Sequence, residues 1–330
     1  MDASNEPVQL VGTLMSSFVD SRCVHVVANL GVADVIGDEP MPIAEVAGTL
    51  GVDAGSLTRL LRHLVTLGLF SIDRNTVTHN EASRLLRSDH PQGMLSLTQM
   101  MALPLIWDSA RHLEDAVRTG RPGATFVDQR GFFDYLADHP DESAVYDRGM
   151  SAMTTRQIAA QVPSYDFSGF ERIADIGGGR GHLIRAILDQ TPKARGIVFD
   201  QPHVVKDAIP HDRLTIQAGS FFLDPLPVAD CYVMSNIVHD WADDEARAIL
   251  RAVRDAAATD STLLLMEFVV PEDDEDFEAT DIDIDIDMLI LVGGRERTER
   301  QYDQLLASSG WRLTRAIPTE RQTLLEAHIA

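Results

Sequence analysis

Near the start of the chain, apolar residues recur every three to four positions among polar ones, and this spacing predicts a long amphipathic helix. The helix should run from Val8 to about Leu30, because Gly31 follows as a stop signal. Its apolar stripe requires a partner surface, since it would otherwise stay exposed to water. The stripe consists of Leu10, Leu14, Phe18, Val24, Val27 and Leu30.

The next segments combine short helical and short strand patterns. Helical spacing covers residues 43–47 and 56–65, and apolar residues at 67–70 and 77–78 predict two short strands. A helix, a turn, a second helix and a small hairpin form a winged-helix pattern, which many DNA-binding proteins use. The candidate recognition helix offers few basic side chains, namely Arg59, Arg62 and His63. We therefore expect this fold to pack against another subunit rather than to bind DNA.

Further helices are predicted between residues 92 and 162, where they should connect two domains. Proline and glycine separate the helical segments, which are 94–101, 106–117, 132–137 and 144–162. In the last segment, Met150 and Met153 lie on one helical face with Ile158 nearby. Methionine is flexible and suits irregular cavities, so these residues could belong either to the core or to a pocket wall.

From residue 170 onward, strand and helix patterns alternate. This alternation specifies a parallel sheet covered by helices, in which ligands bind at the carboxyl ends of the strands. The predicted strands are 173–176, 196–199, 215–218, 231–235 and 263–269, and the predicted helices are 182–188, 203–208 and 245–258.

The balance of charge excludes several classes of partner. With 28 Lys and Arg against 51 Asp and Glu, the formal net charge is −23. Such a chain repels phosphate backbones and anionic lipid surfaces, so we expect neither nucleic acid nor a membrane as a partner.

Cysteine usage and the N-terminus bear on the compartment. Cys23 and Cys231 lie far apart and form neither a disulfide framework nor a paired metal motif. Residues 1–6 lack the basic start and apolar core of a signal peptide, and no apolar run is long enough to cross a membrane. We therefore expect a cytoplasmic protein.

A glycine-rich turn is the most informative motif. Asp175 lies in the strand that precedes it, and Gly177, Gly179 and Gly181 let the backbone turn sharply and approach a ligand closely. The following strand ends in Asp200, at the position where acids of doubly wound folds bind ribose hydroxyls. A dinucleotide fingerprint would place its third glycine at position 182, which is His182 here. The spacing therefore favours S-adenosylmethionine over NAD.

Three further residues should lie at the same edge of the sheet. His239 follows the strand 231–235, Glu267 lies at the end of the next strand, and Glu296 precedes a later helix. Two carboxylates could thus converge on one imidazole. A neutral imidazole, with a pKa of about 6.5, can accept a proton, and a carboxylate on its far nitrogen would fix the tautomer. Either glutamate could instead be a salt-bridge partner.

One segment, residues 272–287, is strongly acidic, with ten acids and no base. If the run from Asp281 to Asp287 were a strand, alternate aspartates would share one face and could bind a hard cation. On a helix they would spread around the axis. We expect a solvated loop that enters a helix N-terminus, where acids are favourable, and no metal.

Taken together, these motifs resemble the S-adenosylmethionine-dependent small-molecule O-methyltransferases. This family includes plant caffeic acid and hydroxyindole O-methyltransferases and bacterial antibiotic-tailoring enzymes. The resemblance covers nearly the whole chain, and it implies an α/β fold with three parts: an N-terminal all-helical winged-helix dimerisation domain (1–90), a helical connector that contributes to the substrate pocket (91–162) and a Rossmann-like methyltransferase domain (163–330). The motifs are residues 177–181, 199–205, 219–222, 239–241, Glu267 with Pro271 and Glu272, and 293–298.

The resemblance also implies ligands and roles. The family uses S-adenosylmethionine, releases S-adenosylhomocysteine and forms homodimers whose N-terminal domains interlock. His239 would be the general base, with Glu267 and Glu296 holding or polarising it. The cofactor-binding residues would be Asp175, Gly177, Gly179, Asp200, Ser220, Phe221 and Ser235, and the residues on the side of the small-molecule acceptor would be Met150, Asn236, Asp285 and Met288.

Some positions depart from the family pattern. Many relatives have an acid where this chain has Ser220, and plant members have Lys at Ser235 and Trp at Asn236. The family usually has a single aspartate where this chain has an acidic run, and Asp285 aligns best with it. Plant substrates are therefore a poor guide to the acceptor.

The expected function is methyl transfer to a hydroxyl of a small aromatic or polyketide-like metabolite. Methylation of sulfur or nitrogen stays open, because a base beside a methyl donor does not identify the acceptor atom. A hydroxylase or decarboxylase on the same scaffold is another alternative, although it would not need His239. A cofactor-sensing winged-helix regulator is the least favoured, because the net charge opposes DNA binding.

Overall fold

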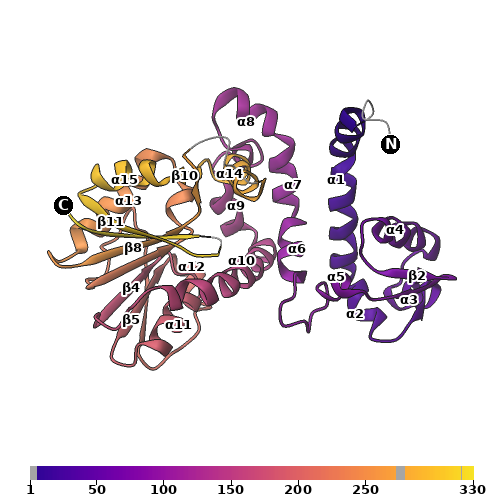
Figure 1. Ribbon diagram of the computed structural model, residues 1–330, viewed down its shortest axis with the longest axis horizontal. Coiled ribbons are helices and arrows are strands. Elements are labelled where there is room, and N and C mark those ends of the chain that lie inside the picture. The colour runs from indigo at the N-terminus through magenta and orange to yellow at the C-terminus, as the bar shows by residue number, and fades with distance from the viewer. Residues whose placement is uncertain (1–5, 273–278, 321) are drawn as a thin grey trace. The chain divides into compact units, whose positions relative to one another are not determined.

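The computed structural model describes residues 6–272, 279–320 and 322–330, with only the backbone described at 279–281. The chain divides into two compact units (Figure 1). The first unit comprises Met1–Trp107 and Asp141–Ala152, and the second comprises Asp108–Pro140 and Met153–Ala330. The N-terminal residues 1–5, on which part of the signal-peptide argument rests, lie outside the described residues.

The first unit begins with the predicted long helix. Helix α1 runs from Glu6 to Leu30 and ends where Gly31 adopts a positive φ of 69°. Helix α4 starts at Ala54, two residues before the predicted start, because the side chain of Asp53 caps it by accepting a hydrogen bond from the backbone N–H of Ser56. The helices of this unit up to residue 101 are α1 (Glu6–Leu30), α2 (Val32–Ile36), α3 (Ile43–Leu50), α4 (Ala54–Thr66), α5 (Glu81–Arg84) and α6 (Leu95–Met101).

A three-stranded sheet forms the wing, with the order β1-β3-β2. Its strands are β1 (Met41–Pro42), β2 (Ser71–Asp73) and β3 (Thr76–Thr78). The prediction of a strand at 67–70 is wrong. Gly68 and Phe70 have positive φ values of 90° and 62°, so these residues form a turn and β2 begins only at Ser71. The N-terminal domain is therefore helical apart from this wing.

A helical stretch follows between residues 104 and 164. Its elements are α7 (Pro104–Arg111), α8 (Leu113–Thr119), the 3₁₀ helix η2 (Gly123–Phe126), α9 (Phe132–Asp138), α10 (Pro140–Gln161) and η3 (Val162–Ser164). The single helix predicted at 106–117 is wrong, because the chain breaks at His112. The ring of His112 stacks on Phe126 at 5.4 Å and its Nδ1 lies 2.8 Å from the Asp115 carboxylate, contacts that accompany the break.

A seven-stranded sheet forms the centre of the second unit, in the order β11-β12-β8-β7-β4-β5-β6. Strands β8, β7, β4, β5 and β6 run parallel, which confirms the prediction. An antiparallel hairpin that the sequence patterns did not predict, β11 with β12, extends the sheet beside β8. The strands are β4 (Arg172–Ile176), β5 (Arg195–Asp200), β6 (Leu214–Ala218), β7 (Cys231–Ser235), β8 (Thr262–Glu267), β11 (Trp311–Pro318) and β12 (Thr323–Ile329).

Helices cover both faces of this sheet (Figure 1). Helices α13 (Asp243–Ala256) and α15 (Glu299–Ala307) pack on one face, and α11 (His182–Gln190) packs on the other. Alternate residues of β4 serve the two cores: Ala174 and Ile176 contribute to the first and Ile173 to the second. The remaining elements are α12 (Pro202–Val205), the 3₁₀ helix η4 (Val238–Asp240) and the short parallel pair β9 (Val269–Val270) and β10 (Arg297–Thr298).

Helix α14 (Ala279–Leu291) contains the acidic run Asp281 to Asp287. The expected helix N-terminus is present, but the helix begins at Ala279, so the run itself is not the expected loop, nor is it the strand on which a cation site would depend. Successive residues of a helix are rotated by about 100°, so aspartates two positions apart point to different sides and the four of the run do not share one face. The helix packs against α8 and η2 and buries Ile290, and this packing favours the helix over a solvated loop. The neighbouring acids at 273–278 lie outside the described residues.

Over residues 6–272, 279–320 and 322–330, none of the helices has both the length and the apolar character that a membrane crossing requires.

Candidate active site

The glycine turn joins β4 to α11 and exposes backbone at the carboxyl end of the sheet. Gly177, Gly179 and Gly181 have φ values of 73°, 58° and 82°, a region that other residues rarely adopt. A Cβ added at Gly177 would lie 2.4 Å from the Ile237 side chain, whereas one at Gly179 would meet nothing within 4 Å. The turn therefore packs tightly at its start and leaves open space at Gly179.

Asp200, at the end of β5, holds this turn. Its Oδ2 accepts a hydrogen bond of 2.8 Å from the backbone N–H of Gly179, and its Oδ1 accepts one of 2.6 Å from Gln201. Asp175 is buried nearby at the end of β4. Burial, together with the charge of Asp200, raises the pKa of Asp175 to about 7. The structure thus brings the two predicted acids to the glycine turn.

Several buried polar atoms at this edge of the sheet lack a protein partner. Beside the glycine turn they include Oδ2 of Asp175 and Oγ of Ser235, which ends β7, and near His239 they include Oε2 of Glu267 and Oε2 of Glu296. Buried polar atoms are normally hydrogen-bonded, so each has the capacity to contact a polar ligand.

The loop after β6 contains Ser220 and Phe221. The backbone N–H of Ser220 donates to Asp224 at 2.9 Å, and its hydroxyl accepts from the N–H of Phe222 at 3.3 Å. The ring of Phe221 contacts Trp241 edge to face, with centroids 5.7 Å apart. Since Trp241 closely follows His239 in the chain, this aromatic contact connects the loop to the candidate base.

His239 and Glu296 form a buried pair. His239 lies in η4 and is 6% exposed, and Glu296 is 5% exposed. The Nδ1 atom of His239 is 2.7 Å from Oε1 of Glu296. On the other side of the ring, Nε2 lies 3.5 Å from Oδ1 of Asp240. The carboxylate of Glu296 therefore lies against one ring nitrogen, and that of Asp240, which was not predicted to contribute, lies near the other.

Glu267 has a different task. It is fully buried at the end of β8, and its Oε1 accepts hydrogen bonds from the backbone N–H groups of Ile237 at 3.1 Å and Val238 at 2.8 Å. Of the two glutamates that the sequence left open, Glu296 contacts the imidazole and Glu267 holds the backbone of the loop that carries it.

The surrounding carboxylates change the proton affinity of His239. Burial lowers its pKa, but the charge of Asp240, the hydrogen bond to Glu296 and the charge of Glu267 outweigh burial and raise the pKa to about 10. Burial also raises the pKa of Glu267 to about 7 and that of Asp240 to about 6. The surrounding carboxylates therefore favour the protonated ring over the expected neutral form with an ordinary pKa.

Replacing Glu296 with glutamine should lower the pKa of His239, because the amide keeps an acceptor oxygen and removes the negative charge. The ¹⁵N chemical shifts of the imidazole, followed against pH in cofactor-free protein, report this pKa. Glu299→Gln makes the same chemical change at an exposed position and serves as the control. An unchanged pKa in the Glu296 variant would contradict the assignment of this carboxylate.

Asn236 lies in a buried amide network. Its φ is 54°, its Nδ2 donates to Gln157 at 2.9 Å, and its Oδ1 accepts from Gln322 at 2.5 Å. Gln322 also accepts a hydrogen bond from Gln161. Neither Gln157 nor Gln322 was predicted to lie here, because they are 79 and 86 residues away from Asn236 in the chain.

The other residues predicted on the acceptor side, Asp285, Met288 and Met150, lie in different parts of the structure. On α14, Oδ1 of Asp285 accepts a hydrogen bond of 2.8 Å from the backbone N–H of Glu296, so it supports the His239 pair directly. Met288 lies half-buried on the same helix. Met150 belongs to the first unit. Among the described residues, no three or more His, Cys, Asp and Glu are arranged to hold a metal ion.

Family models match two segments of the chain. Residues 110–312 match the O-methyltransferase domain, and residues 13–89 match the O-methyltransferase dimerisation domain.

Individual proteins match along nearly the whole length. A phenazine O-methyltransferase of Lysobacter antibioticus is 34% identical over 317 residues, which cover 93% of this chain and 91% of that protein. An 8-amino-8-demethylriboflavin N,N-dimethyltransferase of Streptomyces davaonensis is 33% identical over 302 residues, which cover 87% and 85%. A crystal structure of an O-methyltransferase from neocarzinostatin biosynthesis, in complex with S-adenosylmethionine and 2-hydroxy-5-methyl naphthoic acid, has a TM-score of 0.83 and 31% identity and covers 94% of this chain and 96% of that one.

Proposed function

The chain belongs to the O-methyltransferase family, and from this premise we propose that it transfers a methyl group from S-adenosylmethionine to a hydroxyl of a small aromatic or polyketide-like metabolite. The observation that carries the proposal is the buried pair of His239 and Glu296 at the sheet edge that also bears the glycine turn. One relative is named for a phenazine, and another was crystallised with a naphthoic acid. We propose that this chain accepts aromatic compounds of the same class.

The chain's own residues fit the cofactor. The space at Gly179, the neighbouring carboxylate of Asp200 and the unpartnered Oγ of Ser235 suit a ligand with a ribose and polar ends. When bound, S-adenosylmethionine supplies an activated methyl group on a positively charged sulfur and becomes S-adenosylhomocysteine. The residues proposed to hold it are Asp175, Gly177, Gly179, Asp200, Ser220, Phe221 and Ser235.

Charge around His239 supports the same ligand. Three carboxylates, those of Asp240, Glu267 and Glu296, lie around a single imidazole. Above the raised pKa values of Asp240, about 6, and Glu267, about 7, all three carboxylates are ionised, and their negative charge outweighs the positive charge of one imidazolium and favours a cation at this place.

His239 is the proposed general base. Glu296 holds its Nδ1, and Nε2 takes the hydroxyl proton of the acceptor as the oxygen attacks. A phenol has a pKa of about 10. The pKa of His239 is raised to about the same value, so proton transfer to the neutral ring is nearly balanced. A positive charge entering the cluster lowers the pKa of the ring and increases its neutral fraction.

Nitrogen methylation is the second candidate, because a relative of 33% identity is an N,N-dimethyltransferase. The same base could take a proton from an amine. The relatives described above are all methyltransferases, which favours methyl transfer over the hydroxylase, decarboxylase and regulator alternatives.

The first experiment is calorimetric titration with S-adenosylmethionine and S-adenosylhomocysteine, followed by an assay of S-adenosylhomocysteine formation with phenols, hydroxyquinones, aromatic amines and small thiols. Binding with product formation on hydroxyl compounds supports the proposal. Product formed only with amines or thiols moves the assignment to those atoms. Absence of binding would overturn the assignment of the glycine turn.

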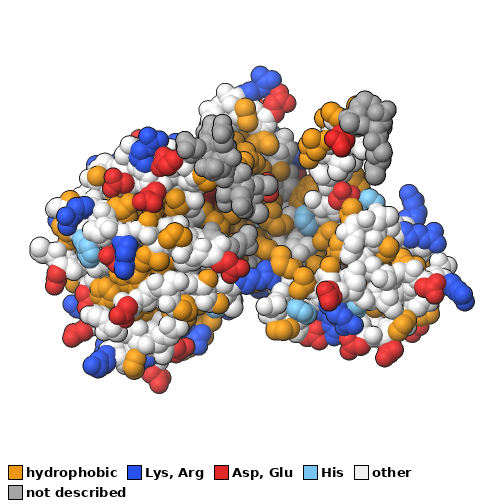
Figure 2. All heavy atoms as spheres, viewed as in Figure 1, with side chains coloured by type: hydrophobic (Ala, Val, Ile, Leu, Met, Phe, Trp, Pro, Cys, Tyr) orange, Lys and Arg blue, Asp and Glu red, His pale blue; other side chains and the backbone are white. Residues whose placement is uncertain are grey.

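The protein is further proposed to be a homodimer through its N-terminal domain, residues 1–90. The match of residues 13–89 to the dimerisation domain supports this. Hydrophobic side chains of α1 also remain at the surface of the single chain (Figure 2), although such a stripe favours burial. Exposed members are Val8, Leu10, Val11, Leu14, Met15 and Phe18, which are 61–75% exposed.

Replacing both Leu14 and Phe18 with glutamate should produce a monomer, because two charges would have to be buried at the interface. Light scattering after size-exclusion chromatography gives the mass. Val117→Glu, at an exposed apolar position on α8, is the control and should keep the mass of a dimer. A double variant that is still dimeric would exclude this face of α1 as the interface.

Both cysteines are free, Cys23 at a partly buried and Cys231 at a buried position. Free thiols suit a reducing compartment, and the proposed location is the cytoplasm.

A further inference from the structure

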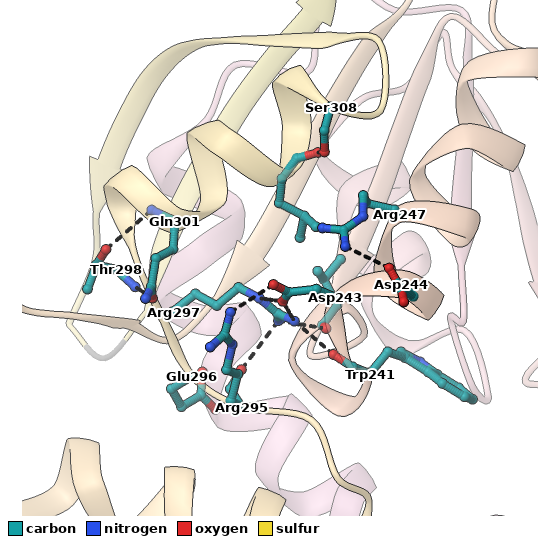
Figure 3. A network of polar contacts seen from close by, with 12 residues as sticks. Trp241, Asp243, Asp244, Arg247, Arg295, Glu296, Arg297, Thr298, Gln301 and Ser308 are labelled. Atoms are coloured by element: carbon teal, nitrogen blue, oxygen red, sulfur yellow. Dashed lines mark hydrogen bonds and ion pairs between the residues drawn. The ribbon is translucent and has the colours of Figure 1, made fainter.

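We propose that Arg297 is a positioning residue for the reaction: its guanidinium binds the backbone on both sides of His239 and thereby keeps the imidazole in register with Glu296. This inference rests on the proposed function, because it concerns the proposed base. Figure 3 shows the guanidinium of Arg297 beside Asp243 and the backbone of Trp241.

The side chain of Arg297 is only 1% exposed. Its Nη1 donates to the carbonyl oxygen of Val238 at 3.1 Å, and its Nη2 donates to that of Trp241 at 2.8 Å. Val238 immediately precedes His239, and Trp241 follows the His239–Asp240 pair. One planar group therefore spans the segment that carries the base.

Asp243 anchors the guanidinium. Its Oδ1 accepts hydrogen bonds from Nε of Arg297 at 3.2 Å and from Nη2 at 2.9 Å. Burial raises the pKa of Asp243, but the hydrogen bond and charge of Arg297 outweigh burial and lower it. Because Asp243 begins α13, the anchor is attached to a helix of the core rather than to a loop.

The partner of the histidine is attached to the same assembly. Glu296 immediately precedes Arg297 in the chain, and the backbone N–H of Arg295 donates to the carbonyl oxygen of His239 at 2.9 Å. On the other side, the N–H of Glu296 donates to Asp285. Arg297 thus connects the segment of Glu296 to both ends of the segment of His239, and the distance between the two side chains depends on this connection.

Arginine suits this task better than lysine. Its planar fork presents donors in fixed directions, so it can reach two carbonyl oxygens and a carboxylate together. A lysine at this position would keep the charge but has one ammonium group on a flexible chain. Arg297→Lys therefore separates the geometry of the fork from its charge.

The test is Arg297→Lys in the full-length protein, with the ring ¹⁵N shifts of His239 as the readout that needs no acceptor. The expected result is a lower pKa of His239, because a looser contact with Glu296 supports the imidazolium less. We also expect kcat to fall about tenfold to a hundredfold, a loss that small misplacements cause, with cofactor affinity within about twofold. The acid limb of the kcat profile should move to lower pH.

Arg247→Lys is the matched control, because it makes the same chemical change in an arginine that forms an ion pair of 2.7 Å with Asp244. Among the contacts of the described residues, Arg247 has none with His239 or Glu296. It should leave the pKa of His239 and kcat unchanged. If Arg297→Lys fails to fold, Asp243→Asn replaces it, because this variant weakens the anchor of the guanidinium. It should also lower the pKa of His239, but by less. An unchanged pKa of His239 in the folded variant would overturn the inference. A shifted pKa in a protein that methylates no acceptor would instead count against the proposed function alone.

Discussion

Replacing His239 with alanine is expected to cut turnover at least about a hundredfold, because the acceptor then loses the group that takes its proton. Cofactor affinity should stay intact, since the residues proposed to hold the cofactor lie at the glycine turn and on other loops. Steady-state kcat with the identified acceptor and calorimetric affinity for S-adenosylmethionine measure the two effects separately.

The control for this prediction is His139→Ala, which is the same substitution at an exposed histidine of the second unit. It should retain the turnover of the unmodified protein. Near-normal turnover of the His239 variant would remove His239 as the base. A loss of cofactor affinity equal to the loss of turnover would instead assign His239 to binding.

Replacing Gly294 with alanine is expected to damage both stability and activity. A Cβ at this position would lie 1.8 Å from the carbonyl oxygen of His239, 2.4 Å from the carbonyl carbon of Asp240 and 2.7 Å from the nitrogen of Trp241. All three are backbone atoms in a segment that Glu267 and Arg297 hold in place, so the clash cannot be relieved by turning a side chain. The free energy of unfolding should fall by about 2–3 kcal/mol or more.

The same displacement should separate His239 from Glu296 and reduce kcat by about a hundredfold in the folded fraction. Urea denaturation gives the stability, and kcat per active site gives the activity. Gly48→Ala is the matched control: a Cβ there meets nothing within 4 Å, and the residue lies inside α3. That substitution should change stability by less than about 1 kcal/mol, in the stabilising direction. Normal activity in the Gly294 variant would show that the segment of Gly294 can move away from residues 239–241 without loss of catalysis.

Most of the fold could be predicted because its patterns are local. The apolar stripe of α1 has helical spacing. The largely buried strand β7 and the fully buried strand β8 appear as apolar runs with helices between them. These features depend on neighbours a few positions away. The alternation also predicted correctly which edge of the sheet would collect Asp200, His239 and Glu267.

Where the prediction was wrong, distant contacts had outweighed the local pattern. The alternating Ile and Asp of α14 have the period of a strand, and the many acids are typical of a solvated loop. Packing against α8 and η2 nevertheless favours a helix. The turn after α4 looked like a strand because its residues are apolar, but Phe70 takes a positive φ and packs into the core.

The sequence by itself determined the kinds of groups at the candidate site: a glycine turn with an acid in register, one histidine and two glutamates at the same sheet edge. Only the tertiary structure decided how they are paired. It brings Glu296 to the histidine across 57 residues, assigns Glu267 to the loop backbone and places Asp240 by the other ring nitrogen. The protonation of His239 follows from that arrangement, because a pKa depends on burial and on charges within a few ångströms, and residues remote in sequence supply much of both.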